Sequence, residues 1–165
     1  MSELETLAER LGCLLIERGE WLAAAESCTG GWLSQSVTAI AGSSTWFDRG
    51  FVTYSNAAKA DMLGVSDSTL ARHGAVSEAV ARAMAQGVLT HSRADWSVAI
   101  TGIAGPSGGS PEKPVGTVCF AWASKDGGCE AQTCLFTGDR ASVREQSVRY
   151  ALNGLIDRVE SAVYS

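Results

Sequence analysis

The chemistry available to this sequence is that of hydroxyl and amine groups. A hydrolase needs a nucleophile, a base and donors for the oxyanion. Only two histidines are present, and neither lies beside a Cys or an Asp at the spacing of metal ligands. A lysine can serve as the base when desolvation lowers its pKa to about 7–8. The candidate nucleophiles are therefore Ser27, Ser44 and Cys28, with Lys59 and Tyr54 as the groups that would move the proton.

Lys59 and Cys28 each have an ordinary structural interpretation beside the catalytic one. Small residues surround Lys59 over 56–60 and could let its side chain press against the protein. The alternative is a solvated helix lysine, which is the common fate of lysines. Cys28 beside a helix N-terminus could be a reactive thiolate, but a buried small side chain is the favoured interpretation.

Three turns of small residues could bring these groups together. They lie around Ser27, around Ser44 and over 101–106. The first turn, within 23–32, follows an apolar strand and precedes a helix, so its N–H groups would favour an anion or a polarised carbonyl. Open α/β sheets bind ligands outside the carboxyl ends of their strands, where the turns after the first and third strands would meet. Each turn could instead be a tight connection that needs glycine, but we expect at least two to line one pocket.

The elements that must position these turns alternate between helix and strand. An apolar stripe predicts a helix over 3–18 that ends at Gly19. Further helices are predicted from the first turn to about 40, in short segments from 55 and 66, from 77, and from about 140 to 159. Apolar runs predict strands at 21–25, 47–54, 96–100, 115–123 and 129–136, the last two joined as a hairpin. This order predicts one α/β domain over 1–165, a three-layer α/β/α sandwich with a mixed sheet.

Composition and charge narrow the class of protein. A chain of 165 residues can bury a full core without disulfides. Acidic residues outnumber basic ones by 18 to 13, for a net charge of −5, which argues against nucleic-acid binding. No apolar run could cross a bilayer and no signal peptide is evident, so we expect no membrane association and a cytoplasmic location. The five cysteines have no CxxC motif and are expected as free thiols, with no metal or other cofactor.

Several short motifs, taken in order, resemble one known family. They are Ala25-Glu26-Ser27-Cys28-Thr29-Gly30-Gly31, Gly42-Ser43-Ser44 with Trp46-Phe47, Tyr54-Ser55-Asn56-Ala57-Ala58-Lys59, Gly74-Ala75-Val76-Ser77, Thr101-Gly102-Ile103-Ala104-Gly105-Pro106 and Lys113-Pro114-Val115-Gly116-Thr117-Val118. Together they span nearly the whole chain and resemble the CinA C-terminal domain family, in its stand-alone length. The resemblance implies a nicotinamide-nucleotide amidohydrolase. Such an enzyme converts nicotinamide mononucleotide and water to nicotinic acid mononucleotide and ammonia, in pyridine-nucleotide recycling.

The resemblance also implies roles for individual residues, those of a serine amidase that uses lysine. The family's active-site serines fall on Ser27 and Ser44, its tyrosine on Tyr54 and its lysine on Lys59. We favour Ser44 as the nucleophile, activated by Lys59 directly or through Tyr54, with Ser27 in support; the reverse assignment of the serines stays open. The oxyanion hole would consist of N–H groups near Ser44 or in the glycine pair after Thr29. The implied substrate-binding positions, with Arg140 at the phosphate, are Glu26, Thr29, Gly30, Gly31, Gly42, Ser43, Thr101, Gly102, Gly105 and Arg140.

Two other classes of function stay open at the level of sequence. The glycine turns could cradle a nucleotide or phosphate in a module without catalysis. The family name also suggests an interaction protein linked to competence, recombination or DNA damage, although the acidic balance counts against direct contact with DNA. A homodimer is possible through helix faces such as that of Trp32 and Leu33, for which a buried core is the favoured interpretation.

Overall fold

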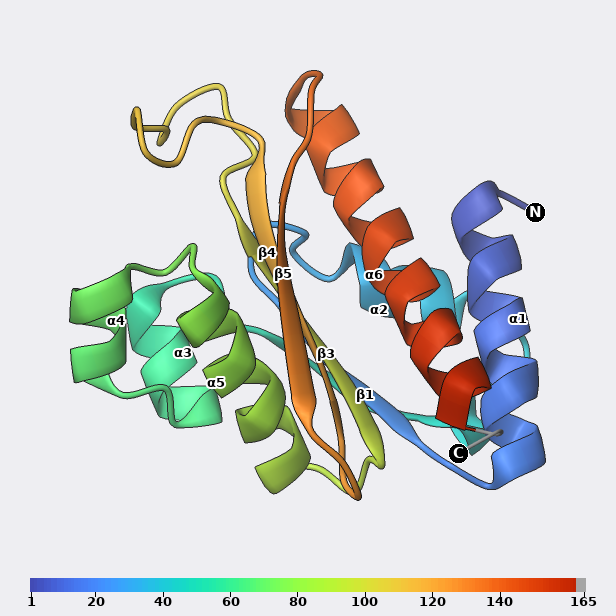
Figure 1. The fold of residues 1–165 in the computed structure, drawn as a ribbon. Coiled ribbons are helices and arrows are strands. Elements are labelled where there is room, and N and C mark those ends of the chain that lie inside the picture. The colour runs from blue at the N-terminus through green and yellow to red at the C-terminus, as the bar shows by residue number, and fades with distance from the viewer. Residues whose placement is uncertain (163–165) are drawn as a thin grey trace.

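Residues 1–162 are described by the structure, a computed structural model, and they form one five-stranded sheet between two layers of helices (Figure 1). The strands are β1 (Leu22–Glu26), β2 (Phe47–Val52), β3 (Trp96–Gly102), β4 (Thr117–Ser124) and β5 (Cys129–Leu135). The helices are α1 (Glu3–Arg18), α2 (Trp32–Thr38), the 3-10 turn η1 (Ser43–Thr45), α3 (Asn56–Leu63), α4 (Asp67–His73), α5 (Glu78–Thr90) and α6 (Arg140–Ala162).

The sheet is mixed, with the order β2-β1-β3-β4-β5. Strands β2, β1 and β3 are parallel, whereas β4 and β5 run antiparallel to their neighbours. At its carboxyl end β1 pairs Glu26 with Val52 on one side and with Ile100 on the other. The segments that leave the three parallel strands therefore start from the same edge of the sheet, where such sheets place their ligands.

Helices cover both faces of the sheet, which explains the run of small apolar residues in β1. In Figure 1, α1, α2 and α6 lie on one side, and α3, α4 and α5 lie on the other. All five residues of β1 are buried. Because strand side chains alternate between faces, Leu22 and Ala24 join the core beneath α1 and α6, while Ala23 and Ala25 join the core beneath α5. The predicted three-layer sandwich with a mixed sheet is confirmed.

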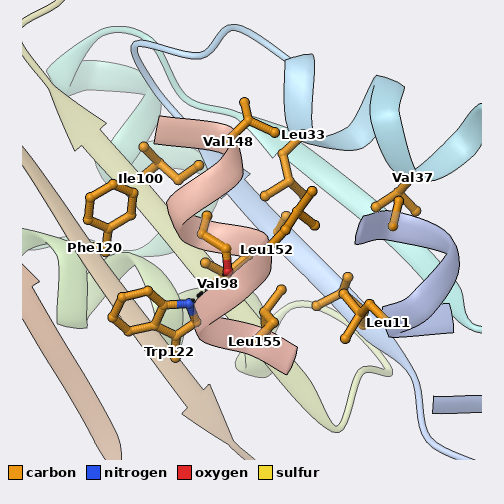
Figure 2. Packing of buried hydrophobic residues seen from close by; sticks show 14 of the residues in the cluster. Leu11, Leu33, Val37, Val98, Ile100, Phe120, Trp122, Val148, Leu152 and Leu155 are labelled. Carbon is orange, nitrogen blue, oxygen red and sulfur yellow. Dashed lines mark hydrogen bonds between the residues drawn. The ribbon is translucent and has the colours of Figure 1, made fainter. Parts of the chain in front are cut away.

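The long helix α6 is held against the sheet by close packing around Trp122 (Figure 2). The indole Nε1 of Trp122 donates a hydrogen bond of 3.1 Å to the carbonyl of Ala151. A Cβ at Gly154 would lie only 2.4 Å from the same ring, so glycine is needed for this approach. Asp139 accepts a hydrogen bond from the N–H of Ser142 and caps the start of the helix. This packing fixes the N-terminus of α6 at the edge of the sheet where the parallel strands end.

Most element boundaries differ from those predicted by one to three residues, and one difference matters for the site. The helix predicted to reach about residue 40 ends at Thr38. The strand predicted over 47–54 ends at Val52. The N–H of Thr53 still donates to the carbonyl of Glu26 in β1, but the carbonyl groups of Thr53 and Tyr54 accept hydrogen bonds from Lys59.

Candidate active site

A buried lysine amine lies beside a serine hydroxyl at the carboxyl end of β1. Nζ of Lys59 is 3.0 Å from Oγ of Ser27. The amine also donates to the carbonyls of Thr53, at 2.9 Å, and Tyr54, at 3.2 Å. Ser27 continues β1 by one residue, with its N–H donating to the carbonyl of Ile100 in β3. The sheet therefore positions the hydroxyl, and helix α3 delivers the amine.

The surroundings of Lys59 favour a neutral amine. The side chain is 1 % exposed, and burial lowers the pKa of its amine below the ordinary value. The two carbonyl oxygens that it contacts can only accept hydrogen bonds, so they take two N–H bonds. In the neutral form the remaining lone pair then faces the hydroxyl of Ser27, from which it can accept a proton.

The turn that follows Ser27 is organised by the buried carboxylate of Glu26. One carboxylate oxygen accepts from Oγ1 of Thr29 and from the N–H of Leu33, both at 2.8 Å. The other accepts from the N–H of Ser34 at 3.0 Å and from its hydroxyl at 2.7 Å. These bonds join the end of β1 to the first turn of α2 and satisfy N–H groups that the helix itself leaves unpaired. Glu26 thus stabilises the turn, and its oxygens point into α2.

Arg144 of α6 holds the same turn from the opposite side. Its guanidinium donates to the carbonyls of Cys28, at 3.0 Å, and Thr29, at 3.2 Å. It also lies over the ring of Trp32, 5.5 Å from the centroid. Glu26 and Arg144 together fix the backbone on both sides of the residue after the serine, which restricts where the hydroxyl can point.

A cavity of about 290 Å³ opens above the serine and the lysine. Its lining comes from the first turn, the start of α3, the segments that precede α5 and follow β3, and the start of α6. The residues are Ser27, Cys28, Tyr54, Asn56, Lys59, Ala75, Val76, Thr101, Gly102, Ile103, Ala104, Gly105, Ser107, Gly108 and Arg140. A cavity of this size admits one small organic ligand.

The far wall of the cavity carries a fixed positive charge. Nη1 of Arg140 donates to the carbonyl of Gly105 at 2.8 Å, and Nη2 lies 3.3 Å from the hydroxyl of Tyr54. Arg140 is also the first residue of α6, where the helix dipole adds positive potential. On the neighbouring wall Thr101 donates to the carbonyl of Ala75 at 2.8 Å. The arrangement can receive an anionic group at one end and a reacting carbonyl at the other.

A surface lysine ties two parts of this wall together. Nζ of Lys113 donates to the carbonyl of His73, the last residue of α4, at 2.7 Å. Lys113 belongs to the loop between β3 and β4, which also supplies Ser107 and Gly108 to the cavity. The segment that continues from His73 supplies Ala75 and Val76.

The structure brings seven of the predicted site residues to the cavity and leaves the others elsewhere. Those at the cavity are Ser27, Tyr54, Lys59, Thr101, Gly102, Gly105 and Arg140. Glu26, Thr29, Gly30 and Gly31 lie in the turn without lining the cavity, and the N–H of Gly30 already donates to the carbonyl of Ser27. That N–H group is therefore not available to an oxyanion.

Ser44 is not beside Lys59, contrary to the expected pairing. Ser44 is exposed within η1, which precedes β2, and Gly42 and Ser43 lie there with it. At its amino end β2 pairs with Leu22, the first residue of β1. The length of β1, about 13 Å for its five residues, separates that end from Ser27. The small-residue turn at 42–44 therefore lies at the opposite edge of the sheet from the cavity, and the expected oxyanion donors near Ser44 are absent from the cavity too.

Comparison with known proteins identifies the family to which this fold belongs. A family model described as the CinA C-terminal domain matches residues 4–159. The chain belongs to the CinA C-terminal domain family.

Relatives of this CinA domain include proteins named as enzymes. It is 58% identical over 155 residues to "Nicotinamide-nucleotide amidohydrolase PncC" of Escherichia coli strain K12, covering 93% of each chain. It is 53% identical over 159 residues to a "Putative competence-damage inducible protein" of Symbiobacterium thermophilum, covering 92% of this chain but 37% of that protein. Among solved structures, the "competence/damage inducible protein CihA" of Agrobacterium tumefaciens superposes with a TM-score of 0.93 at 47% identity, covering 95% of this chain and 96% of the other.

The thiol of Cys28 in this CinA domain lines the cavity beside Ser27 but is protonated at neutral pH. Burial raises the pKa of Cys28 to about 11, and the nearby guanidinium of Arg144 offsets this only in part. A protonated, buried thiol is a poor nucleophile. The favoured interpretation of Cys28 as a buried small side chain agrees with this environment.

Several cavity residues were not singled out as site residues from the sequence. They are Asn56, Ala75, Val76, Ile103, Ala104, Ser107 and Gly108. One signal was available for Asn56, which precedes Lys59 by three residues in the same helix and so shares its face. The others lie in irregular segments, where spacing does not indicate direction.

Two further properties of the described residues bear on function. Within residues 1–162, no three His, Cys, Asp or Glu side chains gather in a group that could hold a metal ion. No helix in the same range is both long enough and apolar enough to span a membrane.

Proposed function

We propose that this protein is a nicotinamide-nucleotide amidohydrolase, which hydrolyses the carboxamide of nicotinamide mononucleotide to give nicotinic acid mononucleotide and ammonia. The observation that carries the proposal is the buried amine of Lys59 in contact with the hydroxyl of Ser27. The names of the relatives that share nearly the full length of the chain support the substrate.

The reaction would begin at Ser27. Lys59 accepts the hydroxyl proton as Oγ of Ser27 bonds to the carboxamide carbon, which gives a tetrahedral intermediate. The protonated amine then donates its proton to the departing nitrogen, and ammonia leaves as the C–N bond breaks. The product of this step is an ester between Ser27 and the nicotinoyl group.

Water completes the cycle at the same two residues. Lys59 accepts a proton from the attacking water and returns it to Oγ of Ser27 as the ester bond breaks. The net change is the addition of one water and the release of one ammonia, with the enzyme restored. A single base thus serves both half-reactions, because the amine lies beside the serine hydroxyl in each of them.

Arg140 and the N-terminus of α6 would bind the phosphate of the nucleotide. The guanidinium is exposed at the mouth of the cavity, and phosphate is favoured at a helix N-terminus beside an arginine. In this assignment Ser27 is the nucleophile, Lys59 the general base and acid, and Arg140 the anion receptor. Glu26 and Arg144 position the turn.

The setting proposed for this activity is the cytoplasm, with a small nucleotide and not a nucleic acid as the ligand. All five cysteines are free, as a reducing compartment would keep them. The net charge of −5 disfavours a nucleic-acid surface.

The test is ammonia release from nicotinamide mononucleotide by the wild-type protein, with Ser27→Ala and Lys59→Ala as controls. We expect turnover by the wild type and a loss of several orders of magnitude in both variants. Calorimetry on Ser27→Ala should still detect the nucleotide. Tight binding without turnover by the wild type would instead favour a nucleotide-binding module.

A further inference from the structure

The side chain of Tyr54 extends away from the lysine that its backbone contacts. Its carbonyl accepts from Nζ of Lys59, while its hydroxyl lies 3.3 Å from Nη2 of Arg140. Among the described residues, neither Lys59 nor Ser27 has a hydrogen bond to the phenol; both contact the Tyr54 carbonyl. A proton relay through this phenol is therefore not what the geometry supports.

Tyr54 joins the two ends of the proposed substrate site. The residue begins at the serine and lysine, where the carboxamide reacts, and its hydroxyl ends at Arg140, where the phosphate would bind. A pyridine nucleotide with its carboxamide at Ser27 and its phosphate at Arg140 would have its ring alongside the phenol ring. Tyr54 is 63 % exposed, so its ring has surface to offer a ligand.

The cavity lining offers a cationic ligand ring an aromatic face but, over the described residues, no carboxylate. Within residues 1–162, the basic side chains that line the cavity are Lys59 and Arg140, and no carboxylate joins them. The nearest buried carboxylate, that of Glu26, is engaged with α2. The pyridinium ring of nicotinamide mononucleotide carries a positive charge that an acidic side chain would otherwise balance. Tyr54 is also the only aromatic residue in that lining over the described range.

We propose that the ring of Tyr54 is the platform on which the positively charged pyridinium ring of the substrate stacks, so that Tyr54 selects for a cationic ring. This assignment rests on the proposed function. The face of a phenol ring carries negative potential and attracts a cation. The contact between its hydroxyl and Arg140 restrains the ring against the cavity. Tyr54 would then contribute to binding and specificity, while Ser27 and Lys59 carry the proton transfers.

Two ligands that differ in the charge of the ring allow the effect of that charge on binding to be measured. Nicotinamide mononucleotide and benzamide riboside 5′-monophosphate share the carboxamide, the ribose and the phosphate, but only the first has a charged ring. Their dissociation constants are to be measured by calorimetry in Ser27→Ala, which binds without turnover, and in this background with Tyr54→Phe or Tyr54→Leu added. Tyr54→Phe is the matched control because it keeps the ring.

The expected result is a preference of about 3- to 30-fold for the cationic ligand in Ser27→Ala. The preference should persist with Tyr54→Phe and fall to near unity with Tyr54→Leu. A preference that is unchanged with Tyr54→Leu, or no preference in Ser27→Ala, or no binding of either ligand, would overturn the assignment. Melting temperatures check that each variant folds.

Steady-state kinetics separate this role from a relay and from failure of the proposed function. With nicotinamide mononucleotide, a platform predicts that Tyr54→Leu raises KM more than it lowers kcat. A relay predicts that Tyr54→Phe lowers kcat as severely as Tyr54→Leu, and this result would contradict the platform. Absence of ammonia release by the wild type overturns the proposed function by itself, whereas the ratio of the two dissociation constants decides the role of Tyr54.

Discussion

Nζ of Lys59 lies 3.0 Å from Oγ of Ser27 and bonds otherwise to two backbone carbonyls, those of Thr53 and Tyr54. Among residues 1–162 no carboxylate is hydrogen-bonded to the amine to hold its proton, and burial disfavours its charge. Lys59 would act on Ser27 as the histidine acts on the serine in other hydrolases. The ordinary pKa of a histidine is already low enough for a base, whereas that of a lysine must be lowered by desolvation.

Replacing each candidate serine with alanine tests which of the two is the nucleophile. Ser27→Ala should lower kcat by at least about 10³-fold, because among residues 1–162 no other hydroxyl that lines the cavity is hydrogen-bonded to Lys59. Ser44→Ala should stay within about twofold of the wild type, because Ser44 is an exposed residue at the other edge of the sheet. Ammonia release is the measurement. Loss of activity in Ser44→Ala with full activity in Ser27→Ala would reverse the assignment.

The pH dependence of kcat/KM should report the amine of Lys59. Activity needs the neutral amine, so the rate should rise with pH through the pKa of Lys59 and then level off. Burial places this pKa below the ordinary 10.5 of a lysine. The profile is read from initial rates between neutral pH and pH 10. A rate that falls over this whole range, or one that rises only beyond pH 10.5, would contradict a desolvated lysine base.

The same burial makes a prediction about stability. Since the folded-state pKa of Lys59 is lowered, the unfolded chain binds more protons between that pKa and 10.5, and stability attributable to this group rises with pH there. Lys59→Met removes the titrating group. The unfolding free energy of the wild type minus that of the variant should therefore increase as pH rises from 7 to 10. Urea unfolding of both proteins at each pH measures the shift, and a constant difference would mean that the amine is not desolvated.

Arg144 should affect the chemical step more than binding. Its guanidinium holds the carbonyls of Cys28 and Thr29, so Arg144→Gln should let the turn move and misplace the hydroxyl of Ser27. Small misplacements of this kind cost about 10- to 100-fold in rate, and we expect this loss in kcat with little change in KM. Arg149→Gln is the matched control, because Arg149 lies on the same helix and pairs with Glu3 and Glu145. Equal losses in the two variants would point to a general loss of α6 packing.

Thiol modification should leave the enzyme active. With its pKa raised to about 11, the thiol of Cys28 is about one part in 10⁴ thiolate at pH 7. Cys13 is exposed and should react with iodoacetamide first. Mass spectrometry locates the label, and an ammonia assay on the same sample measures activity. Inactivation that tracks labelling of Cys28, and that persists in Cys13→Ser, would revive a cysteine nucleophile.

Much of the fold could be predicted because its elements are separated by clear local signals. Gly19 ends α1 with a φ of 65°, as a glycine after a helix commonly does, and Ser55, Ser66 and Ser77 cap their helices as expected. The end of β2 was harder to predict. Thr53 continues the strand's residue types and its N–H still donates to Glu26 of β1, but its carbonyl accepts a hydrogen bond from Lys59.

The candidate site could be predicted less completely, since proximity along the chain does not show which edge of a sheet a turn occupies. The turns at Ser27 and Ser44 have similar small residues, yet one follows β1 and the other precedes β2. In parallel strands these two positions lie at opposite edges. Glu26 likewise belongs to a site motif, but its carboxylate accepts from Thr29 and from the first turn of α2, a direction that depends on where the helix packs.

The hydrogen bond from Lys113 to the end of α4 has a kinetic implication. Because it joins two segments that flank the cavity, we expect the mouth to keep its width before any nucleotide arrives. Association should then follow a single exponential whose rate grows linearly with nucleotide concentration, without the plateau that a slow rearrangement of the receptor imposes. Severing this bond, as in Lys113→Met, should introduce that plateau.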